Sequence, residues 1–191
     1  MKKKGFTIVE LIMVIAIIGI LLGIVTTAAS SSIKQARARK ADACCTIIKE
    51  GLATYNAQFG KWPGDIGDRI ANGSIGPRSN EEGVRDQSDP DKYVLNANEI
   101  DSMIREMVRE AKRGNPLMDI SGLYVSRHPG EPGSRERGLD FMDAVRGTKR
   151  SPRRMKLAEM HFGYPETDSG YFRRFKVVYS IPTDEMKVSK Q

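Results

Sequence analysis

The sequence predicts an α+β fold, in which a long N-terminal helix carries a small antiparallel sheet on its second half. An apolar run of membrane length opens the chain of 191 residues. Apolar residues then recur with a helical period as far as Phe59. Near the C-terminus, segments rich in β-branched and aromatic residues alternate with turns. Hydrophobic residues are 39% and charged residues 29% of the chain, which fits one globular domain with an appendage.

The apolar run is long enough to cross a lipid bilayer. Residues 11–29 are nineteen residues without a charge, and the run counted from Phe6 is interrupted only by Glu10. As a helix it spans roughly 36 Å, against a hydrocarbon core of roughly 30 Å. The lysines at 2–4 precede it and supply three of the seven net positive charges. The remaining excess is mild and does not by itself indicate a nucleic-acid partner.

Residue chemistry leaves three interpretations of the N-terminus open. A secretory signal has a shorter apolar stretch, and AAS at 28–30 resembles its cleavage site only at the far end of the run. A plain membrane anchor fits the length but leaves Glu10 unexplained. A cut between Gly5 and Phe6 would create an α-amino group four residues before Glu10. Glu10 would then either pair with that amine on a neighbouring subunit or lie in the headgroup layer.

The stretch KKKGFTIVELIMVIAIIGIL resembles the leader and N-terminal helix of type IV pilins and type II secretion pseudopilins. The resemblance covers roughly residues 2–30. It implies that a membrane-bound prepilin peptidase cuts after Gly5 and N-methylates Phe6, and that Glu10 sets the register of assembly. It also implies that a cytoplasmic ATPase and a platform protein assemble the chain, with itself and other pseudopilins, into a filament.

The same resemblance supplies the topology: a single pass through the inner membrane, with the C-terminal domain periplasmic or extracellular. Charge alone leaves the orientation undecided, because basic residues flank both ends of the run. Those at the far end are Lys34, Arg37, Arg39 and Lys40.

The helix continues beyond the membrane segment with one apolar stripe. The stripe consists of Ala41, Cys45, Ile48, Leu52, Tyr55 and Phe59. Gly60 and the WPGD turn at 62–65 are expected to end the helix. The predicted divisions are a cleaved leader (1–5), a membrane half (6–30), an amphipathic half (31–60) and a globular domain (61–191).

Two features favour a pseudopilin over a pilin. EGLATYNAQFGKWPGD is similar to the end of the spine helix in the G-type, or major, pseudopilins. The C-terminal cysteine pair of many major type IV pilins is missing. The chain has two cysteines, Cys44 and Cys45, which we interpret as small apolar helix residues rather than a disulfide.

The remaining segments predict further elements. Residues 64–96 are polar and predict a long loop with room for a short turn of helix. NEIDSMIREMVREAKRG predicts an amphipathic helix with Asn98 as its N-cap. LDFMDAV predicts a short helix. MKLAEM, FRRFKVVYS and EMKV predict strands. The apolar face of the amphipathic helix would comprise Ile100, Met103, Ile104, Met107, Val108 and Ala111.

The sequence shows no catalytic constellation, so we do not expect an enzyme. His128 and His161 have no partner at catalytic or metal-binding spacing. Carboxylates do cluster in YPETDSG and PTDEM. Because similar pseudopilins bind calcium in a C-terminal loop, a calcium site is one interpretation of these carboxylates, and solvated turns are the other. The candidate ligands are Glu166, Asp168, Asp184 and Glu185.

The densest group of basic residues is RGTKRSPRRMK at 146–156. A solvated surface is the simplest interpretation of it. Contact with a polyanion through Arg150, Arg153 and Arg154 is the functional one. The sequence therefore predicts a structural pseudopilin subunit without a required cofactor. The alternative is a minor type IV pilin that serves DNA uptake or adhesion through this basic segment.

Overall fold

The computed structural model describes residues 8–73, 75, 84–86, 89–115, 117–129, 135–147 and 153–190. The chain divides into two compact units, one that ends at Ala36 and one that extends from Arg37 to Gln191. Helix α1, Ile8–Phe59, contributes to both units.

In the first unit, α1 is apolar on every side. Its large apolar side chains are exposed, from 44% at Val14 to 78% at Ile8. Among the described residues, α1 is the one helix that is long and apolar enough to cross a membrane. A helix that is hydrophobic all round must be covered by lipid or by other chains. The long N-terminal helix predicted from the sequence is thus confirmed.

In the second unit, α1 supplies part of the core. Gly60 ends the helix with a φ of 67°, and its N–H donates to the Asn56 carbonyl over 2.8 Å. The predicted stripe is buried except for Phe59, which is 40% exposed. Phe59 lies in the last turn and packs its ring on Tyr55 instead of entering the core. The buried residues of α1 are Ala41, Cys44, Cys45, Ile48, Leu52 and Tyr55.

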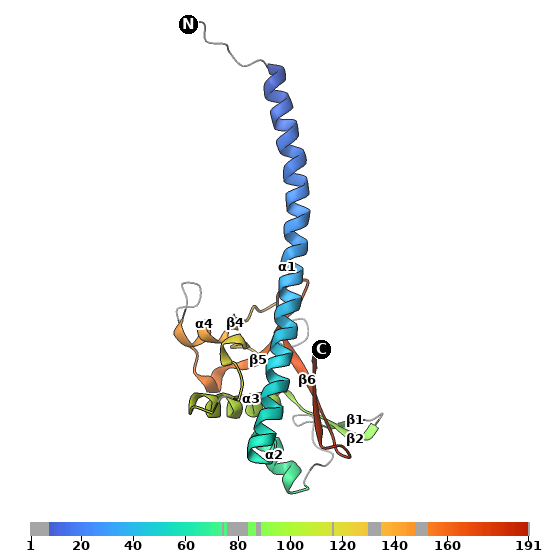
Figure 1. Ribbon diagram of the computed structural model, residues 1–191, viewed down its shortest axis with the longest axis vertical. Helices are drawn as coiled ribbons and strands as arrows, with labels where there is room; N and C mark the ends of the chain where they lie inside the picture. Colours follow the sequence, from blue (N-terminus) through green and yellow to red (C-terminus); the bar gives the residue numbers. More distant parts are fainter. Residues whose placement is uncertain are drawn as a thin grey trace. The chain divides into compact units, whose positions relative to one another are not determined.

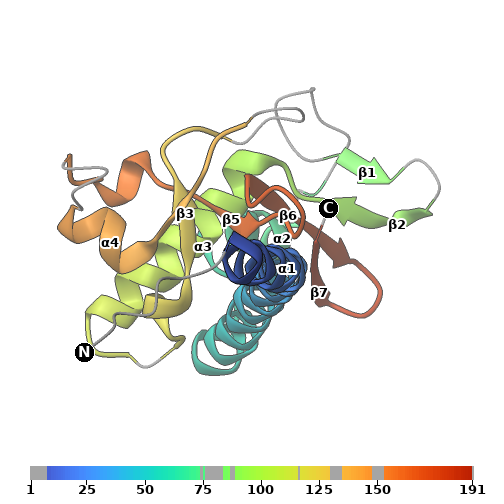
Figure 2. The same ribbon diagram turned by 90° about the horizontal axis from the view of Figure 1, so that it is seen from above.

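The strands form an antiparallel sheet beside the second half of α1 (Figures 1 and 2). The strand order is β1-β2-β6-β5-β3-β4, and β7 also pairs with β6. The strands are β1 Val84–Asp86, β2 Asp89–Val94, β3 Tyr124–Ser126, β4 Leu139–Asp140, β5 His161–Pro165, β6 Phe172–Ser180 and β7 Glu185–Lys190. β6 is central, because its second half pairs with both β2 and β7 while its first half pairs with β5.

The described part of this unit holds three further helices: α2 Gly64–Ala71, α3 Ala97–Lys112 and α4 Phe141–Arg146. Single 3-10 turns lie at Ile120–Gly122 and Leu157–Glu159. The apolar face of α3 is buried as predicted, apart from Ala111, which is half-buried. One continuous core joins α1, α2, α3 and the sheet.

The predicted start of α3 was wrong by two residues. Asn96, not Asn98, is the N-cap, because its side chain accepts from the Glu99 N–H over 2.8 Å. The Glu99 carboxylate in turn accepts from the Asn96 N–H over 2.9 Å, which completes a capping box.

Two other segment predictions need correction. Residues 64–96 do not form one loop, since they contain α2, β1 and β2. MKLAEM is not a strand, because its middle forms the 3-10 turn Leu157–Glu159 while Met155 and Met160 on either side are buried. The predicted strands FRRFKVVYS and EMKV are confirmed as β6 and β7, and most of LDFMDAV lies in α4, which ends one residue later, at Arg146. The α+β fold class is confirmed.

Candidate functional site

The predicted assembly residues lie at the start of the chain. Gly5 and Phe6 are outside the described residues. Glu10 lies in the first turn of α1 and is exposed. A carboxylate there interacts favourably with the partial positive charge at the N-terminus of a helix. At this exposed position the Glu10 side chain is accessible to another molecule.

The four candidate calcium ligands do not form one site. Glu166 and Asp168 precede β6, whereas Asp184 and Glu185 follow it, so the two pairs lie at opposite ends of a nine-residue strand. Within the described ranges, no group of three or more His, Cys, Asp or Glu residues is arranged to hold a metal ion.

The carboxylates are engaged by protein groups. Glu166 accepts from Arg173 Nη2 over 3.2 Å and from the Ser169 hydroxyl. Asp184 accepts from Trp62 Nε1 over 2.8 Å and from the Tyr179 hydroxyl over 3.0 Å. These contacts give both carboxylates a structural role: Glu166 holds the β5–β6 turn to β6, and Asp184 holds the β6–β7 turn to Trp62.

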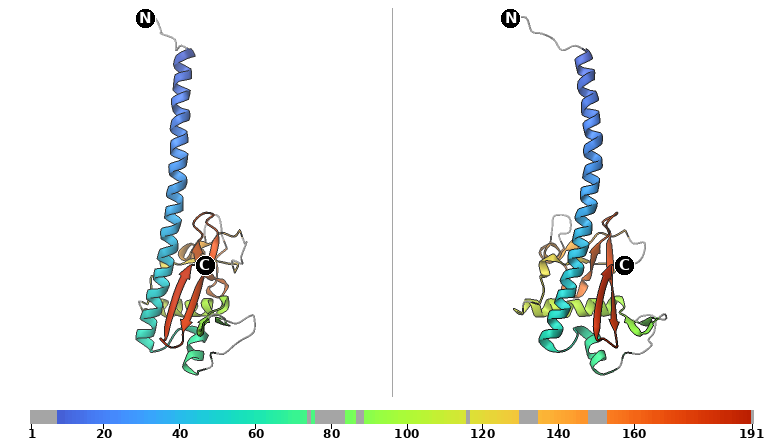
Figure 3. Two further views of the ribbon diagram at one scale, coloured as in Figure 1. Left: turned by 90° about the vertical axis from the view of Figure 1, so that its right-hand side faces the viewer. Right: turned by 45° about the vertical axis from the view of Figure 1, so that its right-hand side comes forward.

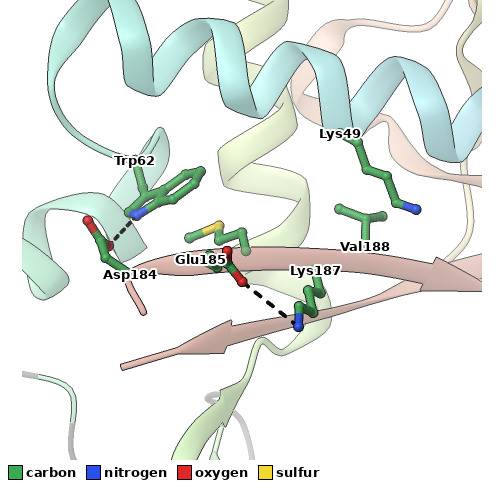
Figure 4. Close-up of a pocket in the computed structure, with 7 residues that line it drawn as sticks. Lys49, Trp62, Asp184, Glu185, Lys187 and Val188 are labelled. Atoms are coloured by element: carbon green, nitrogen blue, oxygen red, sulfur yellow. Dashed lines mark hydrogen bonds and ion pairs between the residues drawn. The ribbon is translucent and has the colours of Figure 1, made fainter. Parts of the chain in front are cut away.

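A groove of about 540 Å³ runs between α1 and β7 (Figure 4). It is lined by Lys49, Trp62, Asp184, Glu185, Met186, Lys187 and Val188. Trp62 and Asp184 also line a second recess, of about 170 Å³, beside α2. Lys49 extends from α1 toward Val188 in Figure 4, and no described carboxylate forms an ion pair with it. The groove therefore combines apolar side chains with two ammonium groups, of Lys49 and Lys187, and two carboxylates, of Asp184 and Glu185.

The hydrogen bond from Trp62 to Asp184 fixes one end of this groove. Asp184 adopts a φ of 48°, which is unusual for a residue with a side chain. Burial, with a further contribution from Asp184, raises the pKa of Tyr179 to about 12. The Tyr179 hydroxyl thus stays protonated and donates to Asp184. Because Asp184 also accepts from Trp62, it holds the β6–β7 turn against the segment after α1.

The basic segment is described only in part. Arg150 lies outside the described residues, and Arg153 and Arg154 are exposed. The neighbouring Met155 is buried, and its N–H donates to the Ala144 carbonyl of α4 over 2.9 Å. The segment is therefore anchored to α4, and the side chains of Arg153 and Arg154 are accessible.

A buried charge network was not predicted from the sequence. Asp101 of α3 is 1% exposed, and its Oδ2 lies 2.7 Å from His161 Nδ1 and 3.1 Å from Arg174 Nη1. Asp101 Oδ1 accepts from the Phe162 N–H over 3.0 Å. The one sequence signal is an acidic residue next to the apolar face of an amphipathic helix. The network ties α3 to β5 and β6, so His161 is not the isolated histidine that its sequence context indicated.

The comparisons with known proteins bear on the N-terminus. Residues 1–26 match the family model described as the prokaryotic N-terminal methylation motif. No curated protein and no solved structure was found to match the chain. The motif is common to pilins and pseudopilins and does not separate them. The chain carries the prepilin-type cleavage and methylation motif, consistent with the type IV pilin and pseudopilin family, and this supports a pilin-like subunit that prepilin peptidase processes.

Proposed function

We propose that the chain is a structural subunit of a type II secretion pseudopilus and makes or breaks no covalent bond itself. The observation that carries the proposal is the methylation motif on an exposed helix of membrane length, whose residues 11–29 carry no charge. In this proposal α1 crosses the inner membrane once, and the globular unit faces the periplasm or the exterior. The partners are other copies, other pseudopilins, prepilin peptidase, the platform protein and the assembly ATPase.

The chemistry of assembly follows from the first turn of α1. A cut after Gly5 exposes the amine of Phe6, which stays cationic after methylation. The Glu10 carboxylate is costly in an apolar environment unless a cation pairs with it. A neighbouring subunit's Phe6 amine supplies that cation at one axial offset, whereas apolar side chains alone would pack at several. Glu10 thus selects the register, and the apolar surface of α1 supplies the packing.

The test replaces Glu10 with alanine in the full chain, in cells with the assembly machinery. We expect cleavage after Gly5 to persist and the yield of sheared filaments to fall at least about tenfold. That factor corresponds to about 1.4 kcal/mol of lost pairing. Glu50→Ala, on an exposed position of α1 in the globular unit, is the matched control. A normal filament yield from Glu10→Ala would refute the role of the carboxylate.

A second candidate is a minor type IV pilin that binds DNA or another polyanion. The exposure of Arg153 and Arg154 favours it. Replacing Arg150, Arg153 and Arg154 with serine should then abolish retention of duplex DNA and flatten the salt dependence of binding. A chain with Lys92, Lys176 and Lys187 changed to serine loses the same charge elsewhere and serves as the control. Equal retention by both variants would remove this candidate.

A further inference from the structure

His161, at the start of β5, lies between a hydrogen-bond acceptor and a hydrogen-bond donor. Its Nδ1 is 2.7 Å from Asp101 Oδ2 of α3 and 2.9 Å from Arg174 Nη2 of β6. Figure 3 shows α3 beside the strands β5 and β6. The side chains of His161, Asp101 and Arg174 are 22%, 1% and 10% exposed. Because a ring nitrogen either carries a proton and donates or has a lone pair and accepts, Nδ1 can bind only one of its two neighbours at a time.

The partners of the surrounding atoms assign the neutral ring to Arg174. Asp101 has a donor at each oxygen without the histidine, namely Phe162 N–H at Oδ1 and Arg174 Nη1 at Oδ2. Within the described ranges, Arg174 Nη2 has no acceptor other than His161 Nδ1. A buried donor without an acceptor costs free energy. In the neutral ring we therefore expect the proton on Nε2 and a lone pair on Nδ1 that accepts from Arg174.

Arg174 also holds two backbone segments. Its Nε donates to the Pro129 carbonyl, in the segment after β3. Its Nη1 donates to the Ala97 carbonyl, at the start of α3, over 3.2 Å. The position of the Arg174 guanidinium therefore decides how firmly both segments are held to β6.

The other charged side chains that α3 and β6 bring near His161 are cationic. Arg105 of α3 donates to the carbonyl of Met160, the residue before His161, over 3.1 Å. Lys176 follows Arg174 on the same face of β6 and is exposed. Asp101 is thus the described carboxylate that faces the ring, and Arg174 already pairs with it.

The third neighbour of His161 is β3. The residue of β3 opposite His161 is Ser126, which is uncharged. The segment that follows carries Arg127 and His128, and His128 Nδ1 lies 3.6 Å from Glu136 Oε1. His128 is therefore the rival source of any effect of pH on this segment, and the test has to separate the two histidines.

We propose that His161 is a pH switch that releases the segment after β3 and the start of α3. A proton added to Nδ1 makes this nitrogen a donor to Asp101 Oδ2. It also places a second positive charge beside Arg174, whose Nη2 loses its acceptor, so the guanidinium withdraws from Pro129 and Ala97. Histidine changes charge between about pH 5 and 8, so the segments loosen as the medium becomes acidic. The switch lies within the globular unit and does not depend on filament assembly.

The test is hydrogen exchange of the full chain in detergent, followed by mass spectrometry at about pH 5 and about pH 8, the limits of histidine titration. Rates are corrected for the intrinsic effect of pH on amide exchange. We expect exchange about tenfold faster in acid, equivalent to about 1.4 kcal/mol, in peptides that span residues 124–129 and 96–101. Residues 41–55 of α1 serve as the internal reference and should keep their corrected rate.

The chain has two histidines, which gives a matched pair of variants. His161→Gln keeps an uncharged side chain that can accept from Arg174, and it should remove the pH dependence. His128→Gln should preserve it. A pH dependence that persists in His161→Gln, disappears in His128→Gln, or is absent from the unaltered chain would overturn the switch.

A second measurement requires no change at His161. The ¹⁵N chemical shifts of labelled histidine report which ring nitrogen carries the proton, and His128→Gln assigns the signals. We expect the neutral His161 ring to carry its proton on Nε2. A neutral ring with the proton on Nδ1 would already donate to Asp101, and the switch would then be refuted even if His161→Gln failed to fold.

Discussion

Replacement of Asp101 by alanine tests whether the buried charge network holds the globular unit together. The change removes the carboxylate that faces Arg174, whose side chain is 10% exposed. It also leaves the Phe162 N–H, which donates to Asp101 over 3.0 Å, without its acceptor. Breaking a buried ion pair by removing one partner costs about 3–5 kcal/mol. For a unit of this size, that loss lowers the melting temperature by about 2–4 °C per kcal/mol.

The assay is urea unfolding of the full chain in detergent, followed by the fluorescence of its single tryptophan, Trp62. Asp101→Asn keeps an acceptor for the Phe162 N–H and should lose less stability than Asp101→Ala. Asp68→Ala removes an exposed pair with Lys61, at 3.1 Å, and should change stability by about 0–1 kcal/mol. If Asp101→Ala destabilises no more than Asp68→Ala, the network contributes nothing and the reasoning is refuted.

Three further predictions concern the same unit. Burial raises the pKa of Cys44 from 9.0 to about 11. The protonated thiol therefore contributes fully to stability below pH 9, and this contribution is lost as the pH rises toward 11. In Cys44→Ala, the urea concentration at the midpoint of unfolding should depend less on pH between 9 and 11. Gly163→Ala would place a Cβ 2.0 Å from the Arg173 carbonyl oxygen and should lower the free energy of unfolding by about 1–3 kcal/mol or more, with Ala43→Ser as the control. Millimolar Ca²⁺ should leave the melting temperature unchanged, because Glu166 and Asp184 already accept hydrogen bonds; a rise that a chelator reverses would contradict this.

The sequence predicted the elements that carry a strong local pattern. The uncharged run and the apolar stripe predicted α1, and the β-branched and aromatic residues of 172–180 predicted β6. β2 was missed because four of its six residues, DPDK, are polar or proline, and its stability comes from pairing with β6, for example Lys92 with Ser180. Such strands depend on a partner distant in the chain, which no local pattern reveals.

Of the functional features, the sequence predicted the contiguous methylation motif but not the contacts between distant residues. The residues of the methylation motif are contiguous, so a short stretch of sequence identified them. Asp101 and Arg174 are separated by 73 positions, and nothing in their flanking residues indicates that they meet. The choice between Asn96 and Asn98 as N-cap, by contrast, could have been made locally, because Glu99 three residues after Asn96 is the signature of a capping box. Glu99 completes the capping box and binds both Arg69 of α2 and the Tyr93 hydroxyl.

The use of one helix in both units has a consequence for proteolytic release. The core includes α1 residues from Ala41 to Tyr55. A protease that cut after Gly60 would therefore release a fragment whose core lacks these residues. A stable shed form must instead retain the chain from about Arg37, where the second compact unit begins. Any fragment found in the medium should therefore carry the polar half of α1. The mass of that fragment identifies where the chain can be severed without unfolding.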